Sequence, residues 1–486
     1  MRKVLHFIGG REVPSKSGET FKDTNPATGA VIAQVASGGV ADVDAAVRAA
    51  SKAYDGTWSK IPPAERGRML YRLAEVLTSE ADALAKLETL DVGKPIRNTT
   101  AGDIPMGIEM FYYYARQCDR LRGTHHCSDP SLLTYSIREP YGVAGLITAW
   151  NYPFVITCVK ASAALAAGNC VVIKPSKDTP LSADLFAKLC AKAGLPDGVV
   201  NVVQGPGSIA GQALAEHAQV PKISFTGSTE TGRAIIRASA QQIKSVTVEL
   251  GGKMANIVFE DADLELALRG SLFTAYINTG QICTSGSRLL VQRSIEKRFV
   301  GELVKLARKL RVGDPQSRQT HLGPMISKDQ FDKVQKYISL AKETCKPIYI
   351  GSVPRNLPKK GLFIAPHIFR VPDPGCRIAR EEIFGPVLSV IPFETEQEAV
   401  RIANSTVYGL SATFWTRDDA RVDRMARQLQ VGIVWGNTVH ALPPDVPYGG
   451  IKQSGLGAES GIEGMLDFMT AKSVVIGKTG NVPSLL

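Results

Sequence analysis

Three side chains of the types that acyl transfer requires follow predicted strands or helices in this sequence. Cys283 ends the run Gly280-Gln281-Ile282-Cys283 after a predicted helix, Glu249 ends a predicted strand, and Asn151 follows another strand. A thiolate can attack a carbonyl carbon, a carboxylate can activate water, and an amide N–H can stabilise an oxyanion. If the three side chains converge, they form a site for covalent carbonyl chemistry.

Each of these residues also has a purely structural interpretation. A cysteine between Ile282 and Thr284 is more often a small core residue than a nucleophile. A glutamate at a strand end is usually a solvated turn residue, and an asparagine before Tyr152 and Pro153 is usually a turn former. Taken one at a time, the residues leave the chemistry open.

Two turns have the composition of a nucleotide site. After the predicted strand 223–225, the turn from Thr226 to Gly232 contains two glycines and opens a helix, so its backbone N–H groups could approach a phosphate. Gly205, Gly207 and Gly211 are spaced one residue too far apart for the common dinucleotide fingerprint G-x-G-x-x-G. Two lysines follow the strand 170–173, where they could bind ribose or phosphate or simply form an exposed loop.

The elements that position these residues follow from periodicity. Residues 62–90 predict one long amphipathic helix and residues 103–117 a second. Strands at 143–148, 170–173, 199–203, 223–225 and 246–248 alternate with helices that begin near Phe154, Pro180, Ile209 and Thr231. This alternation predicts a parallel sheet with helices on both faces and ligands at the carboxyl ends of its strands. A second alternating block covers 255–467, and the segments 132–137 and 473–476 are predicted edge strands that could pair with another subunit.

Composition excludes some classes of function. No apolar run reaches the ~18 residues of a membrane span, and the N-terminus lacks the apolar core of a signal peptide, so we expect a cytoplasmic protein with no membrane partner. The eight cysteines form no C-x-x-C pair, and His125-His126-Cys127 has no second ligand cluster, so we expect no metal. The 57 basic residues exceed the 46 acidic ones but are dispersed, so we expect no nucleic-acid partner.

Seven motifs, in order, resemble those of the aldehyde dehydrogenase superfamily over essentially the whole chain. They are Trp150-Asn151-Tyr152-Pro153, Lys174-Pro175-Ser176, Phe225-Thr226-Gly227-Ser228-Thr229, Glu249-Leu250-Gly251-Gly252-Lys253, Gly280-Gln281-Ile282-Cys283, Glu381-Glu382-Ile383-Phe384-Gly385-Pro386, and Pro447-Tyr448-Gly449-Gly450 with Lys452, Ser454 and Gly455. The resemblance implies an α/β fold with a Rossmann-type dinucleotide-binding domain (1–123 and 142–251), an α/β catalytic domain (252–467) and a small β oligomerisation flap (124–141 and 468–486). It also implies a homodimer or homotetramer.

The resemblance implies a catalytic role for five residues. Cys283 would attack a small-molecule aldehyde, and the Asn151 amide and the Cys283 backbone N–H would stabilise the oxyanion. Hydride would then leave for the nicotinamide, and water activated by Glu249 would hydrolyse the thioester to a carboxylic acid. Lys160 and Glu459 match positions linked to proton traffic. Two alternatives stay open: a CoA-acylating dehydrogenase, against which Glu249 argues, and a non-catalytic protein that retains the fold.

The implied cofactor is NAD(P)+. Its expected contacts are Trp150, Lys174, Ser176, Lys177, Gly207, Gly211, Phe225, Ser228, Thr231, Leu250, Gly251, Gln330, Glu382 and Phe384. Lys177 departs from the pattern, because many NAD-preferring members have a glutamate there, which accepts a hydrogen bond from the ribose 2′-OH and repels a 2′-phosphate. A lysine does the reverse, so we expect NADP+ to be accepted.

The aldehyde tunnel implied by the resemblance is mostly apolar or aromatic. Its expected lining is Met106, Tyr152, Ile156, Val159, Ile282, Thr284, His440, Leu442 and Tyr448. No arginine stands among these positions to bind a second carboxylate, which favours a medium-sized aliphatic or aromatic aldehyde. A dicarboxylic semialdehyde stays possible if an arginine reaches the tunnel from another loop. His440 could hydrogen-bond a substrate hydroxyl or lie at the mouth in water.

Overall fold

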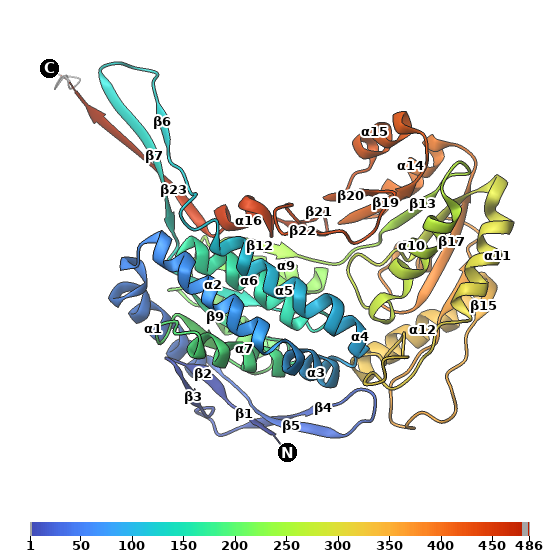
Figure 1. The fold of residues 1–486 in the computed structure, drawn as a ribbon, viewed down its shortest axis with the longest axis horizontal. Coiled ribbons are helices and arrows are strands. Elements are labelled where there is room, and N and C mark those ends of the chain that lie inside the picture. The colour runs from blue at the N-terminus through green and yellow to red at the C-terminus, as the bar shows by residue number, and fades with distance from the viewer. Residues whose placement is uncertain (1, 479–484, 486) are drawn as a thin grey trace.

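The chain folds into two α/β lobes with an extended arm, as Figure 1 shows. The structure is a computed structural model that describes residues 2–478 and residue 485. The remainder of the C-terminal tail, which the family resemblance assigns to the flap, lies outside the described residues.

An eight-stranded sheet forms the centre of the first lobe, in the order β22-β12-β11-β8-β9-β10-β2-β3. The five predicted strands are its parallel centre: β12 (Ser245–Glu249), β11 (Lys222–Thr226), β8 (Val143–Ile147), β9 (Cys170–Lys174) and β10 (Val200–Val202). The edge strands β2 (His6–Ile8), β3 (Arg11–Val13) and β22 (Gly455–Leu456) pair antiparallel and come from near the two chain ends. The sheet is therefore mixed rather than wholly parallel.

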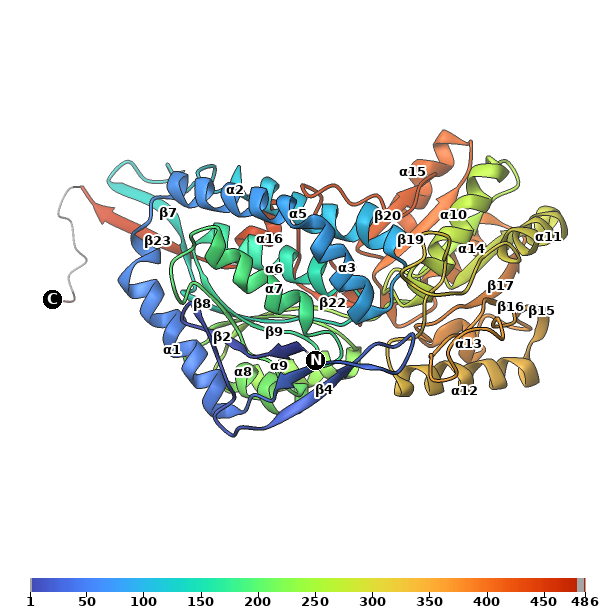
Figure 2. The ribbon, with the colours of Figure 1, turned by 60° about the horizontal axis from the view of Figure 1, so that its bottom comes forward.

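Helices cover both faces of this sheet, as Figure 2 shows. On one face lie α6 (Pro153–Ala167) and α7 (Leu181–Lys192), with α5 (Ile104–Ala115) packed outside α6. On the other face lie α1 (Val40–Gly56), α8 (Gln212–Glu216) and α9 (Thr229–Ala240). The helix predicted near Ile209 begins as a π-helical turn, η3 (Gly207–Gly211), that leads into α8.

The single helix predicted for residues 62–90 is wrong, because the chain forms α2 (Pro63–Ser79) and α3 (Ala81–Val92). The break is at Glu80, whose φ of −105° and ψ of 10° are not helical. Thr78 and Ser79 donate side-chain hydrogen bonds to the carbonyls of Ala74 and Val76, and such bonds compete with helical ones. Gly93 ends α3, where it caps the helix with a φ of 79°.

A seven-stranded sheet forms the second lobe, in the order β15-β16-β17-β14-β13-β19-β20. Its strands are β13 (Ala255–Val258), β14 (Arg288–Gln292), β15 (Lys346–Ile350), β16 (His367–Arg370), β17 (Val387–Phe393), β19 (Ser411–Trp415) and β20 (Ile433–Gly436). Its longer helices are α10 (Leu264–Tyr276), α11 (Glu296–Ala307), α12 (Lys328–Thr344), α14 (Glu396–Asn404) and α15 (Asp419–Gln428). All neighbouring strands are parallel except β15 and β16.

The arm is a three-stranded sheet of β6 (Thr124–His126), β7 (Leu132–Pro140) and β23 (Met469–Gly477). β7 and β23 pair antiparallel along nine residues, and Figure 1 shows them extending together away from the first lobe. The two segments predicted as edge strands therefore pair with each other within one chain. The outer edges of β6 and β23 are the ones that could pair with another subunit.

Several short elements complete the chain. They are β1 (Arg2–Val4), β4 (Thr20–Thr24), β5 (Val31–Ala36), η1 (Trp58–Lys60), α4 (Ile96–Asn98), η2 (Thr99–Asp103), η4 (Ile277–Gly280), η5 (Arg293–Ile295), α13 (Arg377–Arg380), β18 (Tyr408–Gly409), β21 (Ile451–Lys452) and α16 (Gly461–Leu466). Although α16 and β22 fall in the predicted catalytic segment, they pack on α6 and β12 of the first lobe. Within the described residues, no helix combines the length and apolarity needed to cross a membrane.

Candidate active site

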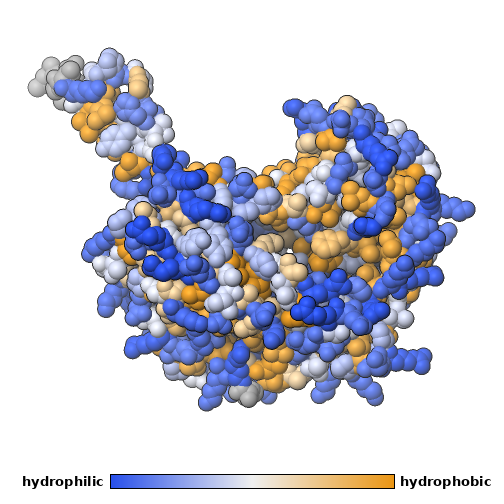
Figure 3. Space-filling view, in the orientation of Figure 1, coloured by the Kyte–Doolittle hydropathy of each residue, from blue (hydrophilic) through white to orange (hydrophobic). Residues whose placement is uncertain are grey.

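A cleft of about 1350 Å³, including its open mouth, contains most of the predicted site residues. Its walls come from the loop after β8, the ends of β11 and β12, the turn at Cys283, α12, the segment around Glu382, and residues 442–460. Both lobes therefore contribute to it, and Figure 3 shows the surface hollowed between them. The first-lobe loops that line it follow the carboxyl ends of parallel strands, as predicted, and residues of α5 and α6 complete that side.

Cys283 lies on a turn that is held by unusual backbone conformations. Asn278 and Thr279 have φ values of 49° and 56°, and Gly280 has a φ of 74°. A Cβ at Gly280 would lie 2.4 Å from the Gly385 carbonyl oxygen, so only glycine fits there. Strained backbone that surrounding contacts enforce is a common feature of functional sites. Cys283 therefore lies on a tight turn rather than at the end of a regular helix, and this turn holds the thiol in a fixed direction.

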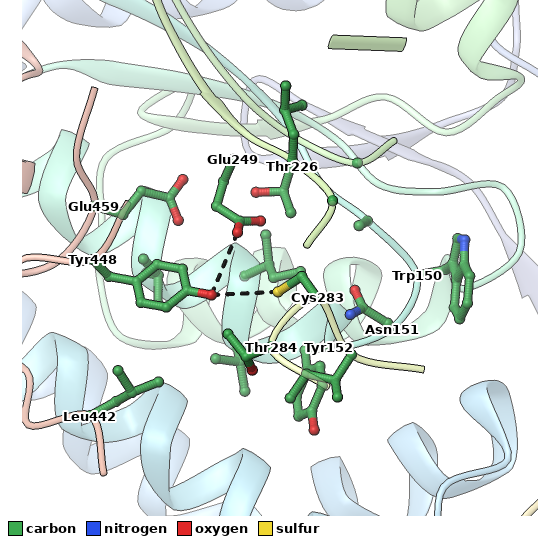
Figure 4. A pocket seen from close by; sticks show the side chains of 18 of the residues that line it. Trp150, Asn151, Tyr152, Thr226, Glu249, Cys283, Thr284, Leu442, Tyr448 and Glu459 are labelled. Atoms are coloured by element: carbon green, nitrogen blue, oxygen red, sulfur yellow. Dashed lines mark hydrogen bonds between the residues drawn. The ribbon is translucent and has the colours of Figure 1, made fainter. Parts of the chain in front are cut away.

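The thiol of Cys283 faces the carboxylate of Glu249 across the hydroxyl of Tyr448 (Figure 4). The Sγ atom lies 3.4 Å from the Tyr448 hydroxyl, which lies 3.5 Å from Oε1 of Glu249. Burial raises the pKa of the Cys283 thiol well above its usual range, and the Glu249 charge raises it further. Burial also raises the pKa of Glu249, and the nearby Glu459 charge raises it further.

Asn151 lines the same cavity beside Cys283, and its side chain is almost wholly buried (Figure 4). Its Nδ2 atom donates to the Gln281 carbonyl at 3.3 Å. Asn278 donates to the Asn151 carbonyl at 3.2 Å and to the Gln281 carbonyl at 3.0 Å. These bonds tie the loop that carries the amide donor to the turn that carries the thiol.

The two weaker catalytic candidates lie together near Glu249. Glu459 lines the cavity and bonds the ammonium group of Lys160, which is wholly buried. Lys160 also donates to the Ser224 hydroxyl at 2.8 Å. The group is therefore a buried polar path that begins at the cavity wall.

Half of the predicted cofactor contacts line the cavity itself: Trp150, Ser228, Leu250, Gly251, Gln330, Glu382 and Phe384. Glu382 accepts a hydrogen bond from the Gly252 N–H at 2.8 Å, and a Cβ at Gly251 would lie 2.4 Å from its Oε2 atom. Phe384 has a φ of 61° and packs edge-on against Trp150. Gln330 donates to the Phe384 carbonyl at 2.9 Å, which holds this strained residue in place.

The other predicted cofactor contacts, Lys174, Ser176, Lys177, Gly207, Gly211, Phe225 and Thr231, lie outside this lining. Lys174 is buried, and a Cβ at Gly207 would lie 3.8 Å from its Nζ atom. Burial, together with the charge of the exposed Lys177, lowers the pKa of Lys174 to about 8. At the start of α9, Ser228 accepts a hydrogen bond from the Thr231 N–H. A helix N-terminus of this kind favours phosphate.

The cavity contains eight of the nine predicted tunnel residues but not His440. Nε2 of His440 lies 3.0 Å from the Thr284 carbonyl oxygen and 3.2 Å from the Thr274 hydroxyl, and the ring packs against Phe273 and Trp435. His440 therefore lies behind the cavity wall, where it supports Thr284.

Sequence reasoning missed several lining residues that helical spacing could have found. Met110 lies one turn after Met106 on α5, and Lys333 lies one turn after Gln330 on α12. The other additions are Ala149, Val155, Thr226, Gly227, Pro443, Val446 and Ser460.

Comparison with known proteins agrees with this fold. The chain matches the aldehyde dehydrogenase family over residues 13–474 and belongs to that family. It is 43% identical to the Bacillus subtilis (strain 168) protein DhaS over 470 residues, which are 96% of this chain and 94% of the relative. The structure resembles PnpE from Pseudomonas sp. WBC-3, with 40% identity, a TM-score of 0.97 and coverage of 100% of this chain and 99% of that chain.

A third relative has been solved with its dinucleotide. Betaine aldehyde dehydrogenase from Staphylococcus aureus in complex with NAD+ is 36% identical, with a TM-score of 0.96 and coverage of 99% of this chain and 96% of that chain. This protein is therefore an aldehyde dehydrogenase, an oxidoreductase that oxidises an aldehyde with a nicotinamide dinucleotide.

Proposed function

We propose that the protein oxidises its aldehyde through a thioester on Cys283 and releases the acid by hydrolysis. One observation carries this proposal: a thiol, an amide donor and a buried carboxyl converge on a single cavity. In the first step Cys283 attacks the aldehyde carbon. The Asn151 amide and the Cys283 backbone N–H stabilise the oxyanion, and these donors need no reorganisation because the turn and the loop are bonded together.

The residues present fit a bound dinucleotide. Gly207 and Gly211 leave space beside the Lys174 ammonium group, where a Cβ at Gly211 would come within 3.4 Å of the lysine side chain. Ser228 caps the N-terminus of α9, where the helix end favours a pyrophosphate, and Glu382 faces the cavity as an acceptor for ribose hydroxyls. When bound, the nicotinamide supplies the acceptor for the hydride that leaves the aldehyde carbon.

The buried carboxylate of Glu249 supports hydrolysis rather than transfer to CoA. Once the thioester has formed, Glu249 takes a proton from water as that water attacks the acyl carbon. Lys160, Ser224 and Glu459 lie beside this step and provide a route for the proton. A protein that kept only the fold would not need this arrangement of polar groups around a thiol.

Lys177 supports acceptance of NADP+. It follows β9 on the exposed side of Lys174, so a 2′-phosphate on the adenosine ribose would meet two lysines. Charge-assisted contacts of this type are stronger than neutral ones.

The cavity wall supports a medium-sized aliphatic or aromatic aldehyde as the substrate. Its substrate side is formed by Met106, Met110, Val155, Ile156, Val159, Leu442, Pro443 and Val446. The charged residues among the lining are Glu249, Glu459, Glu382 and Lys333, and none of the described lining residues is an arginine. A dicarboxylic semialdehyde would therefore bring its second carboxylate to a mainly apolar wall.

We further propose that residues 1–123 and 142–251 bind the dinucleotide, 252–467 carry the nucleophile, and the arm joins subunits into a dimer or tetramer. Exposed Val475 and Ile476 on β23 support the last assignment, because an apolar strand edge in water favours association.

The test is absorbance of reduced nicotinamide with a panel of aldehydes, with and without CoA. Wild-type enzyme should oxidise hexanal and benzaldehyde faster than succinic semialdehyde, without CoA, and should yield the free acid. Cys283→Ser should be inactive. Glu249→Gln should release about one equivalent of reduced cofactor per subunit and then stall. Turnover that requires CoA, or a Glu249→Gln variant with normal steady-state turnover, would reject the hydrolytic mechanism.

A further inference from the structure

Behind the loop that carries Asn151 lies a buried ammonium group that the thioester mechanism does not use. The Lys94 side chain follows α3 and is 1% exposed, and its Nζ atom lies 3.0 Å from the centroid of the Tyr152 ring. Tyr152 and Asn151 line the cavity and Lys94 does not, so the ammonium group contacts the ring from behind the cavity wall. An ammonium group is attracted to an aromatic face, most strongly where water is excluded.

Two carboxyl groups hold this ammonium group and the start of α6 in place. Oδ2 of Asp103, at the end of η2, lies 2.5 Å from Nζ of Lys94, and both side chains are buried. Glu88 on α3 is wholly buried and accepts a hydrogen bond from the Phe154 N–H at 3.4 Å. The first turn of α6 is therefore held by groups from α3 and from the segment that leads into α5.

Asn151 is held from two sides. On the second-lobe side, Asn278 donates to the Asn151 carbonyl at 3.2 Å, and the Asn151 amide donates to the Gln281 carbonyl at 3.3 Å. On the first-lobe side the next residue is Tyr152, and Figure 4 shows both residues near Cys283. Tyr152 precedes α6 without a side-chain capping hydrogen bond, so its ring depends on packing and on the ammonium group for its position.

We propose that Lys94 is a positioning residue, which fixes the Tyr152 ring and through it the Asn151 amide that stabilises the oxyanion. Lys94 acts through its neighbours and touches neither the aldehyde nor the dinucleotide. A misplacement of ~1 Å at a reacting centre can cost about a hundredfold in rate, so a small shift of Tyr152 is enough to matter. The inference rests on the proposed role of Asn151.

The direct test neutralises the ion pair without leaving a buried charge. Lys94→Met combined with Asp103→Asn, the neutral-pair variant, removes the ammonium group from the Tyr152 ring and should fold better than Lys94→Met alone. Stopped-flow absorbance of reduced nicotinamide gives the rate constant of the first turnover with saturating aldehyde and dinucleotide. This rate constant should fall by at least about tenfold. Dinucleotide binding, measured by fluorescence titration, should not change.

A double-mutant cycle with Asn151→Ala tests whether the effect passes through the amide. In a protein that already lacks this amide, the neutral-pair variant should lower the first-turnover rate constant by no more than about twofold. Tyr152→Leu removes the same contact but leaves the ion pair intact, so it tests the proposal even if the neutral-pair variant is unstable. Its rate constant should also fall by at least about tenfold, and that fall should likewise disappear in Asn151→Ala.

Arg370→Met combined with Glu296→Gln is the matched control. This ion pair is also 2.5 Å long, it lies in the second lobe, and neither residue lines the cavity. Its first-turnover rate constant should match wild type. All rates are measured well below the thermal unfolding midpoint of each variant.

Three results would overturn the positioning role of Lys94. They are a wild-type first-turnover rate constant in the neutral-pair variant, a loss confined to aldehyde affinity, and a fall of the same size with and without the Asn151 amide. A near wild-type rate constant in Asn151→Ala alone would instead overturn the proposed oxyanion role, so the two failures are distinguishable.

Discussion

Exchange of Lys177 for glutamate should move the enzyme from NADP+ towards NAD+. Lys177 is exposed and follows β9, and it is close enough to the buried Lys174 to lower the pKa of that ammonium group. Lys177→Glu would place a carboxylate where the 2′-phosphate of NADP+ is expected. The same carboxylate could accept a hydrogen bond from the free 2′-OH of NAD+.

The size of the effect follows from the exposure of Lys177. A charge-assisted contact contributes roughly 1.5–3 kcal/mol, and water around an exposed side chain places this one at the lower end, about 1.5 kcal/mol. Repulsion between one phosphate charge and the new carboxylate at ~4 Å adds about 1 kcal/mol in a water-like medium. The ratio of kcat/KM for NADP+ to that for NAD+ should therefore fall by roughly seventyfold.

The assay compares both dinucleotides with one saturating aldehyde, at one ionic strength, by absorbance of reduced nicotinamide. Lys297→Glu is the control, because Lys297 is an exposed lysine on α11 of the second lobe and the variant changes the net charge by the same amount. Its cofactor ratio should match wild type. A ratio in Lys177→Glu that stays within about twofold of wild type would refute the placement of the 2′-phosphate beside this lysine.

Three further outcomes are expected. Asn151→Ala removes one oxyanion donor, and such a loss typically raises the barrier by ~2.7–4 kcal/mol. Steady-state kcat should therefore fall on the order of hundreds of times. A fall of less than about tenfold would contradict the proposed role of Asn151. Lys94→Met leaves Asp103 buried without the ammonium group that now lies 2.5 Å from it, so the free energy of unfolding in urea should fall by about 3–5 kcal/mol. Adding Asp103→Asn to this variant should restore part of that loss. An unchanged unfolding midpoint in Lys94→Met would count against the ion pair. Because burial holds the pKa of Lys174 at about 8, its charge is present below that pH and lost above it. A pH profile of kcat/KM for NADP+ should therefore fall through about pH 8, and Lys174→Met should lack this fall.

The parts of the fold that depend on local pattern were predictable. The five central strands of the first sheet are short apolar runs between turn residues, and each was placed within about a residue of its observed ends. Their parallel order brought Asn151 and Glu249 to one edge, as the carboxyl ends of such strands require. Cys283 needed a second kind of information, the family motif, because an isolated cysteine between Ile282 and Thr284 gives no sign of its role.

What could not be predicted depends on contacts between distant parts of the chain. The break at Glu80 coincides with hydrogen bonds that Thr78 and Ser79 donate to the backbone, which hydrophobic periodicity does not reveal. The pairing of β7 with β23 joins segments separated by more than 300 residues, so the same patterns fitted a contact with another subunit. His440 was placed in the tunnel by position alone, whereas its bonds to Thr284 and Thr274 turn it behind the wall.

The segment around Ser454, which leads back from the second lobe to the first, explains why the site residues keep a fixed arrangement. Ser454, wholly buried, accepts a hydrogen bond from the Gly409 N–H at 2.9 Å and donates to the Gly251 carbonyl at 2.7 Å, so it joins the two lobes just beyond Glu249. Its own carbonyl accepts from the Leu250 N–H at 2.8 Å. These bonds fix the segment that carries Tyr448 against the end of β12. The thiol on the second lobe and the carboxyl on the first are thereby held on opposite sides of one hydroxyl, and a rigid arrangement of this kind keeps reacting groups in a fixed orientation.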